Sequence, residues 1–159
     1  MPISYTPATK EDLENSWNRE IAENPNDNRY IIWKEQFLRD NESGKCKTFF
    51  AKNDKEIIGQ LTLILKTKDT AELNALRLYP QHQGKGIASE LVKFAETWAR
   101  QNGIKSLIIG VEPHETRNKE IYTHWGFTQF VESKQEKYPP KNTQDEGEVF
   151  TVMYYRKPL

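Results

Sequence analysis

A short loop holds the residues whose types and spacing best suit chemistry: Gly84 and Gly86 flank Lys85 directly before a helical apolar pattern. The first N–H groups of a helix lack internal acceptors, and the helix dipole is positive at that end. Glycines let an anion approach the backbone without meeting a Cβ, and Lys85 adds positive charge. The physics of the loop therefore points to an anion such as a pyrophosphate, but the two glycines taken alone favour an ordinary strand-to-helix turn.

Other reactive side chains show weaker patterns. The spacing around Lys85 matches neither the P-loop nor the dinucleotide fingerprint. His82, His114 and His124 lack metal-ligand spacing, so they are interpreted as surface or loop residues and no metal is predicted. Cys46 is the only cysteine, read as a half-buried residue with a reactive thiol as the alternative, and no cysteine–histidine–carboxylate arrangement supports an acyl-cysteine intermediate.

The elements around the loop follow from periodicity. An extended apolar run, Leu73 to Leu78, predicts a strand that Tyr79-Pro80 ends, because proline removes a backbone donor. After Gly86, the apolar residues share one helical face, and the opposite face carries mainly Lys85, Lys93, Glu96 and Arg100. Asn102-Gly103 is a typical helix stop.

The rest of the chain alternates between strand and helix patterns. A strand at 3–5 precedes a helix capped by Thr9 and an aromatic-rich helix at 29–39, most of whose apolar residues we expect in the core. Residues 41–44 are expected to form a loop. Further strands are predicted at 47–52, 56–66, 106–111, 127–132 and 149–156, a helix at 116–125, and a flexible loop or hairpin connection at 133–147. This order predicts a mixed α/β sheet with helices on its faces.

Composition limits the function classes. A length of 159 residues suits one domain over 1–159, and the formal net charge of zero gives no general case for nucleic acid or a membrane surface. No apolar run reaches the length of a membrane span, and the N-terminus lacks the pattern of a signal peptide. A reduced, cytoplasmic setting is therefore expected.

Two motifs resemble those of the GCN5-related N-acetyltransferase (GNAT) superfamily. Gln81, Gly84 and Gly86 match its pattern Q/R-x-x-G-x-G/A, after a strand and before an amphipathic helix. Downstream, I-Y-T-H-W-G-F at 121–127 is similar to the family's closing Y-x-x-x-G-F segment. The two motifs have the right order and separation, and the resemblance extends over nearly the whole chain.

The resemblance implies a single-domain, mostly antiparallel GNAT-like central sheet with helices on both faces. The strands carrying Glu72 and Val111 would splay apart, so that the pantetheine arm of coenzyme A adds as a pseudo-strand. Acetyl-CoA is the implied co-substrate. Its implied contacts are Leu76, Arg77, Leu78, Gln81, His82, Gln83, Gly84, Lys85, Gly86, Ile87, Ala88 and Asn118. Asn118 enters as a substitute, because the family commonly has asparagine where Glu115 stands here.

The same resemblance implies two catalytic residues. Glu72 matches the general base of the histone-acetylating branch, with a solvent-exposed strand-end carboxylate as the alternative and Glu112 as a weaker candidate base. Tyr122 matches the tyrosine near the coenzyme sulfur, where a phenol can protonate the leaving thiolate; a core tyrosine is the alternative.

The resemblance thus implies an N-acetyltransferase that moves an acetyl group to a primary amine directly in a ternary complex. A non-catalytic acyl-CoA-binding or sensing domain is the alternative. The acceptor is left open between a small amine, such as a polyamine or aminoglycoside, and a protein lysine or N-terminus; a homodimer is also left open. Six acidic residues near the expected acceptor side mildly suit a cationic amine, but a solvated helix face is the preferred interpretation. They are Glu11, Asp12, Glu14, Glu20, Glu23 and Asp27.

Overall fold

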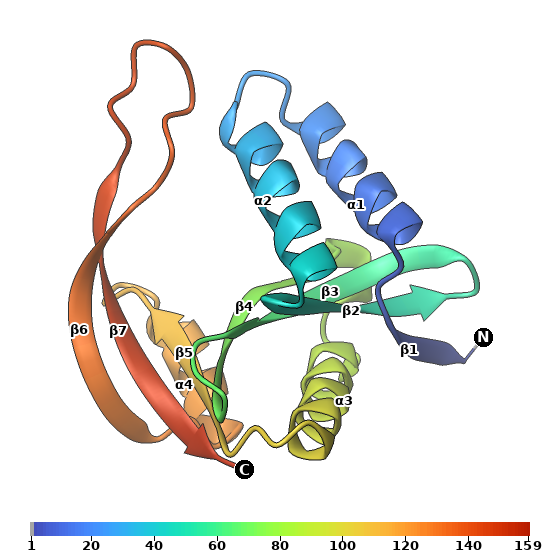
Figure 1. Cartoon of the computed structure of the whole chain (residues 1–159), viewed down its shortest axis with the longest axis vertical. Coiled ribbons are helices and arrows are strands. Elements are labelled where there is room, and N and C mark those ends of the chain that lie inside the picture. Colours follow the sequence, from blue (N-terminus) through green and yellow to red (C-terminus); the bar gives the residue numbers. More distant parts are fainter. Residues whose placement is uncertain (1) are drawn as a thin grey trace.

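A seven-stranded sheet runs through the computed structural model, which describes residues 2–159 (Figure 1). All neighbouring strands are antiparallel except β4 and β5, which are parallel. The predicted mixed, mostly antiparallel sheet is confirmed. In spatial order the strands are β1 (Ile3–Pro7), β2 (Cys46–Asn53), β3 (Glu56–Leu65), β4 (Thr70–Leu78), β5 (Ser106–Val111), β7 (Val149–Pro158) and β6 (Gln129–Lys137).

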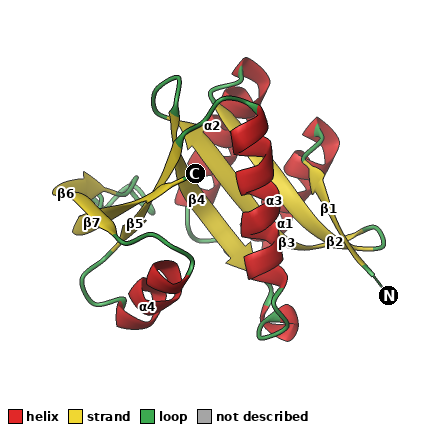
Figure 2. Cartoon of the chain, turned by 90° about the horizontal axis from the view of Figure 1, so that it is seen from below, coloured by secondary structure: helices red, strands yellow, loops and turns green. Residues whose placement is uncertain are grey.

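Helices cover both faces of this sheet. Helices α1 (Lys10–Glu23) and α2 (Arg29–Ser43) lie on one face, and α3 (Ile87–Gln101) lies on the other, as Figures 1 and 2 show. The short helix α4 (Thr116–His124) packs at the edge of the α3 face, where Tyr122 and Trp125 contact the main core. The predicted element order is therefore confirmed.

Strand alternation divides the apolar side chains between two cores. Phe49 and Phe50 are neighbours in β2 and both are fully buried, but they point to opposite faces. Phe49 belongs to the main core under α3, and Phe50 packs with Leu13 and Trp17 of α1. The aromatic side chains of α2 reach this second core only partly: Trp33 and Phe37 are half-buried.

The ends of α1 and α2 follow local chemistry. The N–H of Asp12 donates to Thr9 Oγ1 at 3.1 Å, so the predicted cap is confirmed. The loop predicted at 41–44 is wrong, because α2 continues to Ser43 and ends at Gly44 with a φ of 83°. The Asn41 amide donates to Thr48 Oγ1 at 3.0 Å and accepts from the Thr48 N–H at 3.0 Å, which fastens this last turn to β2.

The loop predicted to begin at Ser133 is also wrong in its first part. Strand β6 continues to Lys137, which pairs with Val149 of β7. The hairpin is therefore longer than expected, and it rises beside α2 in Figure 1. Because β6 is the outer strand of the sheet, most of its side chains are exposed, and its sequence carries no apolar alternation.

Two further expectations about single residues are corrected. Glu96 lies on the buried side of α3, where its carboxylate accepts from Lys157 Nζ at 2.7 Å. Cys46 is buried rather than half-buried, and burial raises the pKa of its thiol to about 12. A reactive thiol is therefore excluded at neutral pH, since the thiolate is the nucleophilic form.

None of the helices within residues 2–159 is long and apolar enough to span a membrane.

Candidate active site

A cavity opens where β4 and β5 separate. Their parallel pairing extends from Thr70–Ser106 to Leu73–Ile109, while both strands continue further. The cavity has a volume of about 590 Å³ and is lined from both strands, from α4 and from the β6–β7 hairpin. The predicted splayed strand pair is confirmed. Backbone groups beyond the last pair lack a partner strand, which suits an extended ligand.

An irregularity in β4 accompanies this separation. The register between β3 and β4 shifts from Gln60–Arg77 to Thr62–Asn74, so β4 contains one extra residue there. Ala75 lies in this bulge with a φ of 50°, a conformation that non-glycine residues rarely adopt. A bulge re-aims side chains and interrupts regular pairing. It lies where the cavity begins.

The glycine loop follows β4 directly. After the short 3₁₀ helix η1 (Pro80–His82), Gly84 and Gly86 both have a φ of 77°, and α3 begins at Ile87. A Cβ built on either glycine would meet no atom within 4 Å. The glycines are therefore required by backbone conformation and leave open space beside the start of α3, whose first N–H groups lack intrahelical acceptors.

Glu72 is a buried residue of the cavity wall. Its relative exposure is 7%, so the alternative of a solvent-exposed strand-end carboxylate is wrong. Asn74 Nδ2 donates to its Oε2 at 2.8 Å, and Lys66 Nζ lies 3.5 Å from its Oε1. A hydrogen bond from β4 and an ion pair with Lys66, directly after β3, thus hold the carboxylate in the cavity, where it can accept a proton.

Tyr122 lies on the α4 side of the cavity, half-buried beside Trp125 with ring centroids 5.8 Å apart. Burial, and secondarily the nearby Glu115 carboxylate, raise the pKa of Tyr122 above its usual value. The phenol therefore keeps its proton at neutral pH and remains a donor.

The side chains of Asn118 and Glu115 are hydrogen-bonded to each other. Asn118 Nδ2 donates to Glu115 Oε2 at 2.7 Å, and Glu115 Oε1 accepts from the Glu112 N–H at 2.9 Å. Glu115 and Glu112 line the cavity. Glu115, which stands where the family commonly has asparagine, is thus part of the site and fixes the turn between β5 and α4.

Arg77 points away from the cavity. Its Nη1 lies 2.7 Å from Oε2 of the buried Glu20 on α1, and the Tyr79 hydroxyl donates to Glu20 Oε1 at 3.3 Å. The guanidinium of Arg19 stacks 3.8 Å from the centre of the Tyr79 ring. This group ties α1 to the end of β4, so a coenzyme contact predicted at Arg77 concerns its backbone.

Several cavity residues were missed by sequence reasoning, among them Tyr154, Glu136, Tyr138 and Phe150. Tyr154 of β7 is 8% exposed, and its hydroxyl donates to Glu136 Oε1 on β6 at 2.9 Å. A Cβ at Gly110 would lie 3.0 Å from the Tyr154 ring, so this glycine allows the ring to cross β5. The only sequence signal was the alternation of β7, which places Val152 and Tyr154 on one face.

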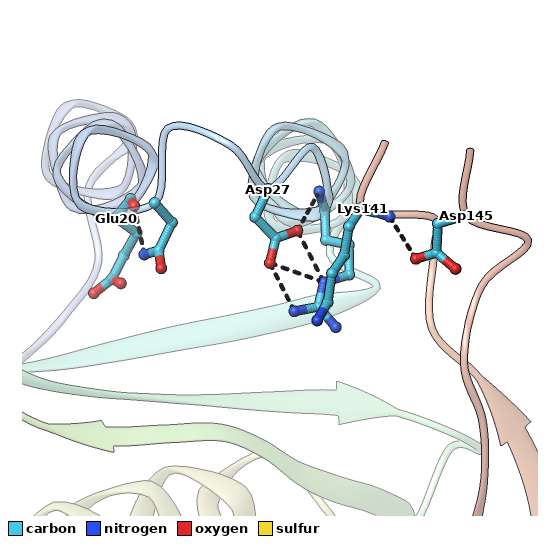
Figure 3. A network of polar contacts seen from close by, with 6 residues as sticks. Glu20, Asp27, Lys141 and Asp145 are labelled. Atoms are coloured by element: carbon cyan, nitrogen blue, oxygen red, sulfur yellow. Dashed lines mark hydrogen bonds and ion pairs between the residues drawn. The ribbon is translucent and has the colours of Figure 1, made fainter. Parts of the chain in front are cut away.

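The β6–β7 connection closes one side of the cavity by contacting α2. Tyr138 and Phe150 stack with ring centroids 4.1 Å apart and line the cavity. The N–H of Asn28 donates to the Lys141 carbonyl at 2.8 Å, and Lys141 in turn donates its N–H to Asp145 (Figure 3).

The three histidines do not gather at this site. No histidine of the described chain lines the cavity, and no group of three histidine, cysteine or acidic residues within 2–159 is arranged to hold a metal ion.

Comparison with known proteins identifies the family. Residues 8–127 match the family model described as Acetyltransferase (GNAT) family. The protein therefore belongs to the GNAT acetyltransferase family.

Curated relatives are more distant. Streptothricin acetyltransferase of Escherichia coli is 24% identical over 97 residues, which cover 60% of this chain and 56% of the relative. The uncharacterized N-acetyltransferase YobR of Bacillus subtilis is 26% identical over 87 residues, which cover 55% of this chain and 35% of the relative. The chain thus spans about half or less of the length of these relatives.

Solved structures match over nearly the full chain. A GNAT family acetyltransferase from Elizabethkingia anophelis with acetyl-CoA bound has a TM-score of 0.67 at 20% identity, covering 99% of this chain and 98% of that one. The ribosomal-protein-S18-alanine N-acetyltransferase of Escherichia coli has a TM-score of 0.72 at 14% identity (99% and 94% covered). A spermidine N-acetyltransferase mutant from Vibrio cholerae has a TM-score of 0.68 at 18% identity (98% and 93% covered). At these identities the likeness is one of fold.

Proposed function

We propose that this protein transfers an acetyl group from acetyl-CoA to a primary amine by direct attack in a ternary complex. One observation carries the proposal: a single cavity at the splayed strands is lined by a buried carboxylate, Glu72, and by a protonated phenol, Tyr122. Amine acetylation needs a proton acceptor for the amine and benefits from a proton donor for the leaving thiolate.

The coenzyme fits the groups that the chain offers. Its pyrophosphate is assigned to the space beside Gly84 and Gly86, where no protein atom approaches and the N–H groups at the start of α3 are free to donate. Gln81, His82, Gln83, Lys85, Ile87 and Ala88 surround this loop. The pantetheine amides are assigned to the backbone of Leu76 to Leu78, beyond the last pair of β4 with β5.

Each side chain then has one task. Acetyl-CoA supplies a thioester whose carbonyl carbon accepts the amine. Glu72 takes the proton that the ammonium must lose, directly or through water. Backbone N–H groups of β4 near Leu76 donate to the oxyanion. The Tyr122 hydroxyl donates its proton to the thiolate as the carbon–sulfur bond breaks. The second proton that the attacking nitrogen loses on becoming an amide returns to the Tyr122 phenolate, directly or through water.

Direct transfer is favoured by the composition of the cavity wall. Within residues 2–159, no cysteine, serine, threonine or histidine lines the cavity, and Cys46 is buried elsewhere with a thiol pKa of about 12. An acyl-enzyme step through a cysteine, serine, threonine or histidine therefore has no nucleophile in this cavity. A single reduced cysteine also supports our assignment of a cytoplasmic setting.

The acceptor class rests on chemistry and on relatives. Relatives and fold neighbours are named for streptothricin, for spermidine and for the alanine of a ribosomal protein. We therefore keep the broad class of primary amine, in a small molecule or a peptide.

A thiol-release assay tests the proposed function. Purified protein and acetyl-CoA are combined with a panel of small amines, lysine peptides and peptides with free N-termini. We expect thiol release that depends on both an amine and the protein. Coenzyme A binding without thiol release from any acceptor would instead support the non-catalytic acyl-CoA-binding alternative.

A further inference from the structure

The charged residues of the cavity wall are mostly acidic. Four of its lining residues are acidic and two are basic: Glu72, Glu112, Glu115 and Glu136 against Lys66 and Lys137. The chain as a whole has a formal net charge of zero, so this excess is local. An enclosed surface of one charge sign concentrates ligands of the opposite sign.

The acidic excess is not cancelled by nearby cations. Lys66 is within 3.5 Å of Glu72, so its charge already has a partner. Arg29, which lies 5.4 Å from the Tyr138 ring, is held by both carboxylate oxygens of Asp27 (Figure 3). Glu136 accepts a hydrogen bond from a neutral donor, the Tyr154 hydroxyl. Lys134, on the same face of β6, lies 4.0 Å from Glu136 and 5.3 Å from the centre of the Tyr154 ring, but its side chain is 52% exposed, so solvent screens its charge.

The phenols of the hairpin end respond to this negative potential. Burial raises the pKa of Tyr138, and the carboxylates of Glu112 and Glu115 raise it further. The pKa of Tyr154 is also raised, first by burial and next by Glu72. Carboxylates of β4 and of the connection between β5 and α4 therefore act on the same volume.

This hairpin end also has the shape and surface for an alkyl ammonium. The stacked rings of Tyr138 and Phe150 form an apolar wall beside Glu136. Aromatic faces attract cations, and apolar rings cover methylene groups. Glu136 pairs with Phe150 across the hairpin, whereas Glu72 lies on β4 at the floor of the cavity. The two carboxylates thus offer separate positions for two positive charges.

We infer that the acceptor is an elongated amine with at least two positive charges. The reacting amine lies beside Glu72, and a second ammonium binds Glu136 against the Tyr138–Phe150 wall. This inference rests on the proposed acetyl transfer and narrows its substrate class to di- or polyamines, or groups that present two amines in the same way.

Three amines of equal chain length test the inference: 1,4-diaminobutane, 4-amino-1-butanol and 1-butylamine, each with acetyl-CoA. For the wild-type protein we expect kcat/KM to be at least tenfold higher for the diamine than for either monoamine. That ratio should fall about tenfold or more in Glu136→Gln, because a hydrogen bond to a charged group contributes about 1.5 kcal/mol or more and each 1.4 kcal/mol is a factor of ten.

Glu132→Gln is the matched control. Glu132 lies on the same strand, is 52% exposed, contacts Lys134 at 3.5 Å and does not line the cavity. Its loss should change the diamine-to-monoamine ratio less than twofold. Equal kcat/KM for the three amines, or equal ratios in both variants and the wild type, would overturn the inference and leave acetyl transfer intact. No product from any amine would instead overturn the proposed function.

Discussion

Replacing Gly84 or Gly86 with alanine tests whether the loop binds phosphate or is an ordinary turn. Both residues have a φ of 77°, and a Cβ would meet no protein atom within 4 Å. Alanine there costs only the left-handed backbone conformation, about 1–2 kcal/mol. For a chain of this size each kcal/mol lowers the melting temperature by roughly 2–4 °C.

Gly103 provides a control with the same backbone cost. Its φ is 78°, a Cβ there would also meet nothing within 4 Å, and it lies just after α3, at the end opposite the loop. The ligand-free melting temperatures of Gly84→Ala, Gly86→Ala and Gly103→Ala should therefore fall by similar amounts.

The ligand-induced shift distinguishes the three variants. At a coenzyme A concentration 100 times the wild-type Kd, binding stabilises the protein by about 2.7 kcal/mol. If the added methyl group weakens binding tenfold, this stabilisation falls to about 1.4 kcal/mol. Differential scanning fluorimetry should show the ligand-induced rise roughly halved in Gly84→Ala and Gly86→Ala, and unchanged in Gly103→Ala. An equal rise in all three variants would refute the assignment of the loop as the pyrophosphate site.

Four further outcomes are expected. Glu72→Gln should lower turnover near neutral pH by roughly 10²–10⁴-fold and recover partly at higher pH, where more acceptor is already neutral; a rate lowered equally at every pH would indicate a disturbed cavity instead. Tyr122→Phe should lower kcat far more than it raises the KM for acetyl-CoA. Glu115→Gln should move the alkaline decline of kcat to lower pH, since the Glu115 carboxylate raises the pKa of Tyr122. Profiles of kcat against pH check both variants, and profiles like that of the wild type would count against Tyr122 as the proton donor. The free energy of unfolding, measured at a series of pH values, should fall by about 1 kcal/mol per pH unit above pH 9. The reason is that the pKa of the Cys46 thiol is 9.0 in the unfolded chain and about 12 in the folded protein. The slope should be smaller in Cys46→Ala.

The glycine loop and its flanking elements could be predicted because their signals are local. The strand before Pro80, the two glycines and the apolar face of α3 all lie within one short stretch, and each structural consequence follows from neighbouring residues. The order of strands and helices followed from the same kind of local periodicity.

Features that depend on distant partners could not be predicted. Glu96 was expected in solvent because its helix neighbours on that side are polar, but its partner Lys157 arrives on β7, 61 residues away. Strand β6 extends to Lys137 because β7 pairs with it, and an exposed edge strand needs no apolar alternation.

The acceptor side of the cavity also depends on residues that are distant from one another in the sequence. Tyr154 and Glu136 belong to no motif, and they meet over β5 only because Gly110 leaves room for the tyrosine ring. Glu72 was expected at the start of a strand, whereas β4 begins at Thr70 and pairing on both sides buries the carboxylate. Burial of this kind is a property of the assembled sheet and leaves no mark in the local sequence.

The most direct test of the account is the mass of every reaction component after incubation of the protein with isotopically labelled acetyl-CoA and an amine mixture. We predict labelled, singly acetylated amine in an amount equal to the free coenzyme A formed, and a protein mass that stays unchanged throughout. Free coenzyme A without acetylated amine, or a labelled acetyl group retained on the protein before transfer, would contradict direct acetylation of an amine in this cavity.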